Sequence, residues 1–176
     1  PTPHFAEAAY YMLKNLHTYS TSDLADYNLG NKIIVPIQSN EAVVNSLATT
    51  VLNNNIKIND AGYYFVGGAV NFFISSKTAE AKIHVASNIE VSSDNGTTWR
   101  AISGSKTLFV LYWNGLMNNS LLVPSVLTKL NKNEIIRVVF YRTKDSTNLV
   151  QGDPLSSLGI TNGYGSPSYS ISISKL

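Results

Sequence analysis

Residues Ala81–Val91 read AKIHVASNIEV, and the spacing of their apolar side chains indicates the class of structure. The apolar side chains recur at alternate positions: Ala81, Ile83, Val85, Ile89 and Val91. The positions between them include Lys82, His84, Asn88 and Glu90. Because successive side chains of a strand point to opposite faces, this pattern predicts a β-strand with one face on a core and one face in water.

Segments on both sides of this strand repeat the same two-residue period. The further strand candidates are Lys32–Ile37, Ala48–Ile58, Tyr63–Ile74, Lys106–Trp113, Leu121–Leu130, Glu134–Arg142 and Tyr169–Leu176. Turn-forming residues separate them, as in Asn59–Gly62, Asp94–Gly96 and Asn131–Asn133. About eight short strands with such spacing predict an all-β protein, a jelly-roll β-sandwich that spans residues 31–176.

The N-terminal stretch has a different period. His4–Tyr19 contains no Gly or Pro, and its apolar residues Phe5, Ala9, Met12, Leu16 and Tyr19 follow a heptad pattern. This pattern predicts a short helix, within a neck and linker that cover residues 1–30. The helix either joins a coiled coil that holds three copies together or lies on its own domain.

The composition excludes several classes of protein. Only 14% of the 176 residues are charged, against roughly 25% in average domains, and the net charge is +2. Scattered lysines give no basic stripe for nucleic acid. The chain has no Cys, which excludes disulfides and thiolate metal sites, and no apolar run that would insert into a membrane. No cofactor motif or metal-type spacing of histidines is found, and the start at Pro1 suggests a piece of a longer protein.

Two strand candidates are apolar on both faces. They are Tyr63–Ile74 and Glu134–Arg142. A sandwich covers only one face of each sheet, so the second face needs another cover, either a neighbouring subunit or a segment of the same chain. Within the first of these strands, Gly67–Gly68 indicates a bulge or a close backbone contact.

Three segments resemble a known family. Ile58–Val66, INDAGYYFV, resembles the G-x-Y-x-hydrophobic strand of tumour necrosis factor-like and complement-type globular heads. Leu127–Val138, LTKLNKNEIIRV, resembles their L-x-L-x-x-G-D-x-V hairpin, with Asn133-Glu134 where Gly-Asp is usual. Tyr169–Leu176, YSISISKL, resembles their last strand. The resemblance covers about the last two-thirds of the chain.

This resemblance implies a jelly roll in a threefold trimer that binds a ligand rather than catalysing a reaction. Such heads occur in phage receptor-binding proteins and in collagen-like proteins of spore surfaces. The residues expected near the trimer axis are Tyr64, Phe72, Phe140 and Tyr169. We therefore expect a trimeric, non-enzymatic adhesion head that recognises a cell-surface saccharide. It would stand on a virion tail, at the tip of a tail or baseplate fibre, or on another extracellular surface, joined to other virion or surface-layer proteins through its N-terminus.

Residues Ser92–Trp99 fit the Asp-box pattern S-x-D-x-G-x-T-W, which recurs in sialidases. The pattern predicts a hairpin in which Asp94 binds backbone amides, Gly96 adopts a positive φ and Trp99 packs over the turn. Sialidases also use three arginines, and the chain has three: Arg100, Arg137 and Arg142. A six-bladed propeller needs about twice this length, and the motif occurs once, so the hairpin is favoured over sialidase activity.

Aromatic and amide residues around one strand end form the candidate ligand site. Tyr112, Trp113 and Asn114 combine a flat apolar platform with polar groups, as sugar sites do, and His84 and Arg100 are added as polar contributors. The alternative is that Trp113 belongs to the core. The function hypotheses that compete with the receptor-binding head are a structural spore-surface or exosporium-type head and a monomeric carbohydrate-binding module.

Overall fold

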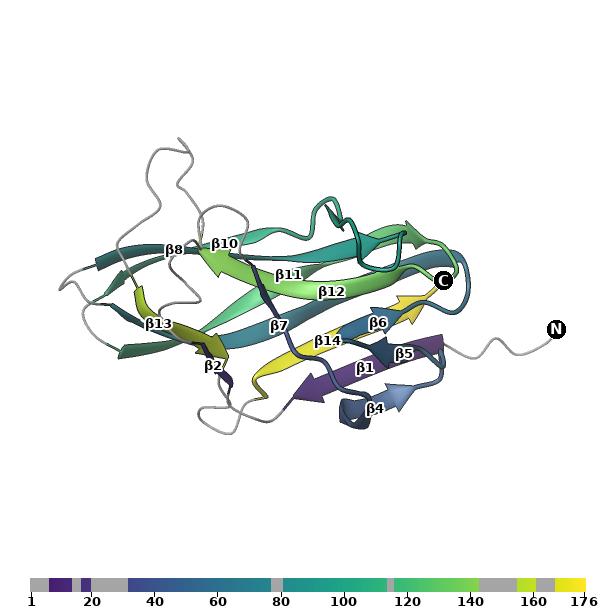
Figure 1. Ribbon diagram of the computed structural model, residues 1–176, viewed down its shortest axis with the longest axis horizontal. Coiled ribbons are helices and arrows are strands. Elements are labelled where there is room, and N and C mark those ends of the chain that lie inside the picture. The colour runs from purple at the N-terminus through teal and green to yellow at the C-terminus, as the bar shows by residue number, and fades with distance from the viewer. Residues whose placement is uncertain are drawn as a thin grey trace.

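The protein is a β-sandwich of two antiparallel sheets packed face to face (Figure 1). The computed structural model describes residues 7–13, 17–19, 32–76, 81–113, 116–142, 155–160 and 167–176. The prediction of an all-β sandwich is confirmed. Among the described elements, no helix is long and apolar enough to cross a membrane.

Sheet A is built around the long strand β7 (Gly62–Ser76). Its strand order is β2 (His17–Tyr19), β13 (Leu155–Ile160), β7, β14 (Tyr169–Lys175), β1 (Glu7–Leu13) and β4 (Ala42–Asn45). The equally long β11 (Leu116–Leu130) pairs with the other edge of β7. The first and last described strands, β1 and β14, are therefore neighbours in one sheet.

Sheet B is built around β8 (Ala81–Ser92) and β12 (Ile135–Arg142). Its strand order is β10 (Thr107–Trp113), β8, β12, β6 (Asn55–Lys57) and β5 (Thr50–Leu52). Two short strands complete it: β3 (Ile33–Ile34) pairs with β12, and β9 (Arg100–Ala101) pairs with β8. A single 3-10 turn, Ser39–Glu41, precedes β4.

The core lies between the two sheets and consists of side chains from alternate strand positions. Four strands contribute much of it: Tyr64, Val66 and Val70 of β7, Ile171 and Ile173 of β14, Val85, Ile89 and Val91 of β8, and Ile136, Val138 and Phe140 of β12. Each aliphatic side chain buried in this way contributes about 1.5–3 kcal/mol relative to exposure. On β8 the apolar alternation in the sequence predicts the core face correctly, because Val85, Ile89 and Val91 are all buried between the sheets.

The eight predicted strands are present, with one of them divided. Ala48–Ile58 contains two short strands, β5 and β6, joined at Asn53 and Asn54, whose φ angles are 49° and 65°. Two consecutive positive φ angles are the signature of a tight hairpin turn, and Asn tolerates them. Five short strands, β1, β2, β4, β9 and β13, were not predicted as strands.

The predicted N-terminal helix is wrong. Residues 7–13 form β1 and residues 17–19 form β2, while the rest of the expected helix lies outside the described residues. Ala9 and Tyr11 are buried at alternate positions of β1, so the period here is two. A short apolar run is compatible with the period of a helix and with the period of a strand. The pairing of residues 7–13 with β14 and β4 selects the strand. Residues 7–13 are thus part of the sandwich and not of a neck before it.

The predicted wet face of β8 is also wrong at two positions. Asn88 and Glu90 have exposed fractions of only 2% and 1%. They point away from the core between the sheets, yet other parts of the same chain cover them. They form a second, polar layer on the outer face of sheet B.

The two glycines inside β7 meet backbone on both sides, which confirms the expectation of a bulge and a close contact. A Cβ on Gly67 would lie 2.9 Å from Ser125 Cα, where the register of β11 shifts. A Cβ on Gly68 would lie 2.1 Å from the carbonyl oxygen of Ser170 on β14. The pairing of β7 with β11 and β14 therefore requires that Gly67 and Gly68 carry no side chain.

Replacement of Gly68 with Ala should lower the free energy of unfolding by about 2–3 kcal/mol, because the new methyl group forces β14 away from β7. Urea unfolding followed by circular dichroism measures this loss. The matched control is Gly62→Ala on the same strand, whose added Cβ would meet mainly the flexible Lys175 side chain at 3.1 Å. Equal losses in the two variants would contradict the close-contact explanation.

Candidate functional site

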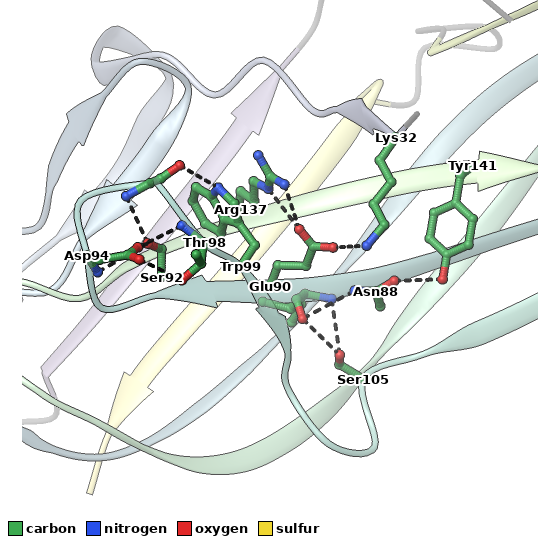
Figure 2. Close-up of polar contacts among 12 residues, drawn as sticks. Lys32, Asn88, Glu90, Ser92, Asp94, Thr98, Trp99, Ser105, Arg137 and Tyr141 are labelled. Atoms are coloured by element: carbon green, nitrogen blue, oxygen red, sulfur yellow. Dashed lines mark hydrogen bonds and ion pairs between the residues drawn. The ribbon is translucent and has the colours of Figure 1, made fainter. Parts of the chain in front are cut away.

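A charged side chain with several partners, Glu90, is buried on the outer face of sheet B (Figure 2). Its Oε2 accepts hydrogen bonds from Arg137 Nε at 2.9 Å and Arg137 Nη2 at 2.8 Å. Its Oε1 accepts a hydrogen bond from Lys32 Nζ. A carboxylate that is 1% exposed is tolerable only with such partners, since burial of an unpaired charge is very costly.

The sheet register places these three residues together. Arg137 on β12 is directly opposite Glu90 on β8. Lys32 precedes β3, whose Ile33 pairs with Phe140, so Lys32 stands beside Tyr141 at the next position of β12. Three segments distant in sequence thus bring one acid and two bases to one face. The sequence holds a signal at Arg137 alone, which is a charged position within the otherwise apolar stretch 135–140 of β12.

Arg137 connects the sheet to the hairpin that follows β8. Its guanidinium carbon lies 3.8 Å from the centre of the Trp99 ring, a cation–π contact. Trp99 in turn donates from Nε1 to the carbonyl oxygen of Gly96 at 3.0 Å. The guanidinium is thus held between a carboxylate and an aromatic face, and the hairpin covers this part of the sheet.

The Asp-box hairpin has the geometry predicted from its sequence. Asp94 Oδ1 accepts the backbone N–H of Thr98 at 2.8 Å and the Ser92 hydroxyl at 2.7 Å, and Oδ2 accepts the Thr98 hydroxyl at 2.6 Å. Gly96 has a φ of +90° and donates its N–H to Ser92 Oγ at 2.8 Å. The strand β9 then pairs back onto β8. Here Asp94 stabilises a turn.

The same bonds explain the acidity of Asp94. The hydroxyl and the backbone N–H of Thr98, followed by the Ser92 hydroxyl, lower the pKa of Asp94 from 3.8 to about 2. All three groups stabilise the charged form of the carboxyl. The Asp94 side chain is exposed, so its contribution to stability is confined to the hairpin.

A second buried carboxyl, Glu134, secures the turn between β11 and β12. It accepts the Ser93 hydroxyl at 2.6 Å and the backbone N–H of Asn131 at 2.7 Å, with Arg100 Nη2 at 3.7 Å. Burial alone would raise the pKa of Glu134, but these hydrogen bonds and the charge of Arg100 lower it overall. Ser93 belongs to the Asp-box hairpin, so Glu134 ties the two turns together.

Tyr141 forms the exposed end of the cluster. Its hydroxyl pairs with Asn88 Oδ1 at 2.9 Å, which fixes the ring over β8. Lys32 Nζ lies 5.5 Å and Lys106 Nζ 5.8 Å from the ring centre. Burial, with the nearby Glu90 charge, raises the pKa of Tyr141. We call Glu90, Arg137, Lys32, Asn88, Tyr141 and Lys106 the Glu90 cluster.

The structure separates the residues predicted to bind ligand. Tyr112 and Trp113 end β10, where they pair with Lys82 and Ala81, and His84 pairs with Val110 of the same ladder. Arg100 pairs with Val91 at the far end of β8, seven positions from His84 or roughly 23 Å along a strand. Asn114 lies outside the described residues, as do the side chains of Tyr112, Trp113 and His84. Arg100 is therefore not part of a site at the end of β10.

Three of the residues predicted near a trimer axis are core side chains of the protomer. Tyr64 is 2% exposed, and Phe140 and Tyr169 are each 1% exposed. The Tyr64 hydroxyl donates to the carbonyl oxygen of Asp60 at 2.6 Å, and the Tyr169 hydroxyl donates to Glu41 Oε2 at 2.5 Å. The fourth, Phe72, lies on β7 opposite Asn119, and its side chain is outside the described set.

Three carboxyls of the described chain are held by hydrogen bonds from other residues. Asp94, Glu90 and Glu134 each accept at least two hydrogen bonds from the chain. Arg137 and Arg100 bind different carboxyls, Glu90 and Glu134, instead of converging on a shared point. In the described part of the chain, no group of three acids or histidines could hold a metal ion. The Glu90 cluster thus offers cationic and aromatic side chains at the outer face of sheet B, and the hydrogen bonds within the cluster hold these side chains in place.

Glu90→Gln should lower the free energy of unfolding by about 2–3 kcal/mol. It leaves Arg137 and Lys32 without their counter-charge, and their partial exposure moderates the loss. The matched control is Glu7→Gln, an acid 51% exposed and 3.7 Å from Lys175, which should cost less than about 0.5 kcal/mol. Chemical denaturation measures both. A Glu90→Gln variant as stable as the control would show that the pairing is dispensable.

Asp94 should titrate in the folded protein with a midpoint near 2, as measured by NMR of its carboxyl carbon. Because the folded-state pKa is depressed, the stabilising effect is fully present above pH 3.8 and is lost as the pH falls through about 2. In the Thr98→Ala variant, which lacks the hydroxyl donor, the midpoint should rise toward 3.8. An unchanged midpoint in that variant would refute the assigned cause.

No family model matches this chain, and no curated protein matches it in sequence.

Proposed function

We propose that this chain is the head of a homotrimeric adhesion protein that recognises a cell-surface saccharide. The sandwich would be a jelly roll of the tumour necrosis factor-like kind, at the tip of a phage tail or on another extracellular surface. The observation that carries the proposal is the exposed apolar face of sheet A. The role is one of binding rather than catalysis.

The outward face of sheet A is apolar near the start of β7. Tyr63, Phe65, Leu127 and Leu176 are 55%, 41%, 54% and 72% exposed. Leu127 is directly opposite Phe65, and the N–H of Leu176 bonds to the carbonyl oxygen of Tyr63. The four side chains thus lie on adjacent strands. We call them the apolar face of sheet A.

The strand beside this patch presents only small side chains outward. Ser172 and Ser174 of β14 are exposed, and Ser174 is opposite Phe65. Tyr10 on β1 is next to Ser172 on one side and Val44 of β4, 47% exposed, on the other. A flat surface of apolar and small residues suits contact with another protein surface better than contact with water.

The sequence of β7 and that of β12 are apolar on both faces, and the outer faces of these two strands are covered in different ways. On β12, the outer face is covered by the same chain, through Trp99 against Arg137 and through Lys32 beside Tyr141. On β7, Tyr63 and Phe65 stay exposed in the single chain. The same-chain alternative therefore accounts for β12, and a second copy is the cover we propose for β7.

The arrangement of the ends supports a head with a distal binding surface. Glu7 pairs with Lys175, so the first described residue and the C-terminal strand end lie together (Figure 1). The start of β11 lies at the opposite end, because Leu116 pairs with Ser75 near the end of β7. Fifteen residues of β7 separate these ends, roughly 50 Å. A saccharide site at Tyr112 and Trp113 would therefore face away from an N-terminal attachment, and three copies would add avidity.

Light scattering after size-exclusion chromatography should give three times the mass of one chain. Phe65→Lys should weaken association at least 10-fold by placing a charge in the interface. The matched control is Leu108→Lys, at a side chain 48% exposed on sheet B, which should leave the trimer intact. A wild-type mass of one chain would refute the trimer and leave a monomeric carbohydrate-binding module.

Trp113→Ala should weaken glycan binding roughly 10-fold while the mass of the assembly is unchanged. A glycan array followed by titration calorimetry tests the saccharide part. Collapse of the fold in this variant would show that Trp113 is a core residue. A stable trimer that binds no glycan would leave the structural spore-surface head as the function.

A further inference from the structure

We propose that the outer face of sheet B binds an acidic saccharide, with its anionic group between Lys32 and Lys106 and its sugar ring against Tyr141. The proposal rests on the proposed saccharide-binding function and adds the charge class of the ligand and a second place for it. The carboxylate of a uronic acid and the phosphate of a phosphodiester-linked glycan share the required chemistry.

The Glu90 cluster has more positive than negative charge. It contains three cations and one carboxylate: Lys32 and Arg137 pair with Glu90, and Lys106 lies over the Tyr141 ring. Arg137 occupies one oxygen of that carboxylate with two hydrogen bonds, and Lys32 occupies the other. Among the residues that the structure describes, no carboxylate lies within ion-pair distance of Lys106, which is exposed. The cluster therefore has a net charge of about +2, which an anion would offset.

The two ammonium groups converge on one fixed ring. Lys32 and Lys106 reach the Tyr141 ring from different strands, since Lys32 adjoins β3, which pairs with β12, and Lys106 precedes β10, which pairs with β8. The bond from the Tyr141 hydroxyl to Asn88 prevents the ring from turning away. Like charges held near one another repel, and an anion bound between them removes this cost. The ring and the ammonium groups are thus preorganised for a ligand that is both flat and anionic.

Apolar surface for a sugar ring adjoins the charges. Leu108 is 48% exposed and is opposite Ala86, which is in turn opposite Tyr141. The small, fully buried Ala86 thus lies between an aliphatic and an aromatic side chain that both reach solvent. Sugars present alternate C–H and hydroxyl faces, so an aromatic ring with an apolar neighbour suits them. A nucleic acid is disfavoured, because the net charge of +2 is scattered and offers few phosphate contacts.

The test compares two charge-neutralising variants of the full chain, Lys106→Gln and Lys132→Gln. Lys132 is exposed in the turn between β11 and β12, away from the Glu90 cluster, so it controls for a general loss of positive charge. Both residues are exposed, so neither change should disturb folding. The probes are polygalacturonate for carboxylate, a polyglycerol-phosphate glycan for phosphodiester, dextran as the neutral polymer and a single-stranded oligonucleotide. Binding is measured by calorimetry at low and at physiological salt.

The expected result is binding of one or both anionic polymers, weaker at higher salt, with a Kd raised about 3- to 10-fold by Lys106→Gln and less than 2-fold by Lys132→Gln. Which polymer binds distinguishes carboxylate from phosphodiester. Equal effects of the two variants, or preference for the oligonucleotide, would overturn the acidic-saccharide site.

The mass of each variant, measured in parallel, separates this inference from the proposed function. Binding of dextran or another neutral glycan that Lys106→Gln leaves unchanged would refute the acidic site and keep the saccharide-binding head. Failure to bind any polysaccharide would refute both. A monomeric protein whose binding still depends on Lys106 would support the acidic site and refute the trimer.

Discussion

A carboxylate buried on the outer face of a sheet, Glu90, is the constraint on which much of this structure depends. Its charge has to be matched, and the match comes from Arg137 across the ladder and from Lys32 before β3. Arg137 then provides a platform for Trp99, and Trp99 holds the Asp-box hairpin over the sheet. Through this series of contacts a single acid determines how β3, β8, β12 and the β8–β9 hairpin are fixed relative to one another. Glu134, which joins the same hairpin to the β11–β12 turn, reinforces it.

Sequence periodicity was sufficient for the long strands because their burial is decided by the strand itself. The Asp-box hairpin was equally predictable, since Ser92, Asp94, Gly96 and Thr98 satisfy one another within a few residues. Where the residues that pair with or cover a segment lie far away in the sequence, the local pattern predicted the structure wrongly. The segment Glu7–Leu13 fits a helix or a strand, and only its pairing with β14 and β4 selects the strand. Asn88 and Glu90 looked solvated because Tyr141, Arg137 and Lys32, which cover them, are distant in sequence.

The candidate site was predictable in part for the same reason. The end of β10 and His84 do belong to one ladder, although the sequence pattern did not predict that these two strands pair. Arg100 was placed with them on residue type alone, and the length of β8 separates it from them. The Glu90 cluster was missed because its members come from four separate segments. The two faces of the sandwich also differ in a way that sequence did not distinguish: sheet B is closed outward by charge and aromatic contacts, whereas sheet A presents Tyr63 and Phe65.

The position of β1 between β14 and β4 has a consequence for how the protein is made. Glu7 pairs with Lys175, so the middle of sheet A joins residues from nearly opposite ends of the chain. During synthesis, β1 leaves the ribosome long before β14 exists, and its Tyr11 cannot be buried until the last strand has been translated. Sheet B, whose strands lie within residues 33–142, can pair earlier. Closure of sheet A is therefore a late, high-contact-order step, slow by nature and possible only after β14 has been translated.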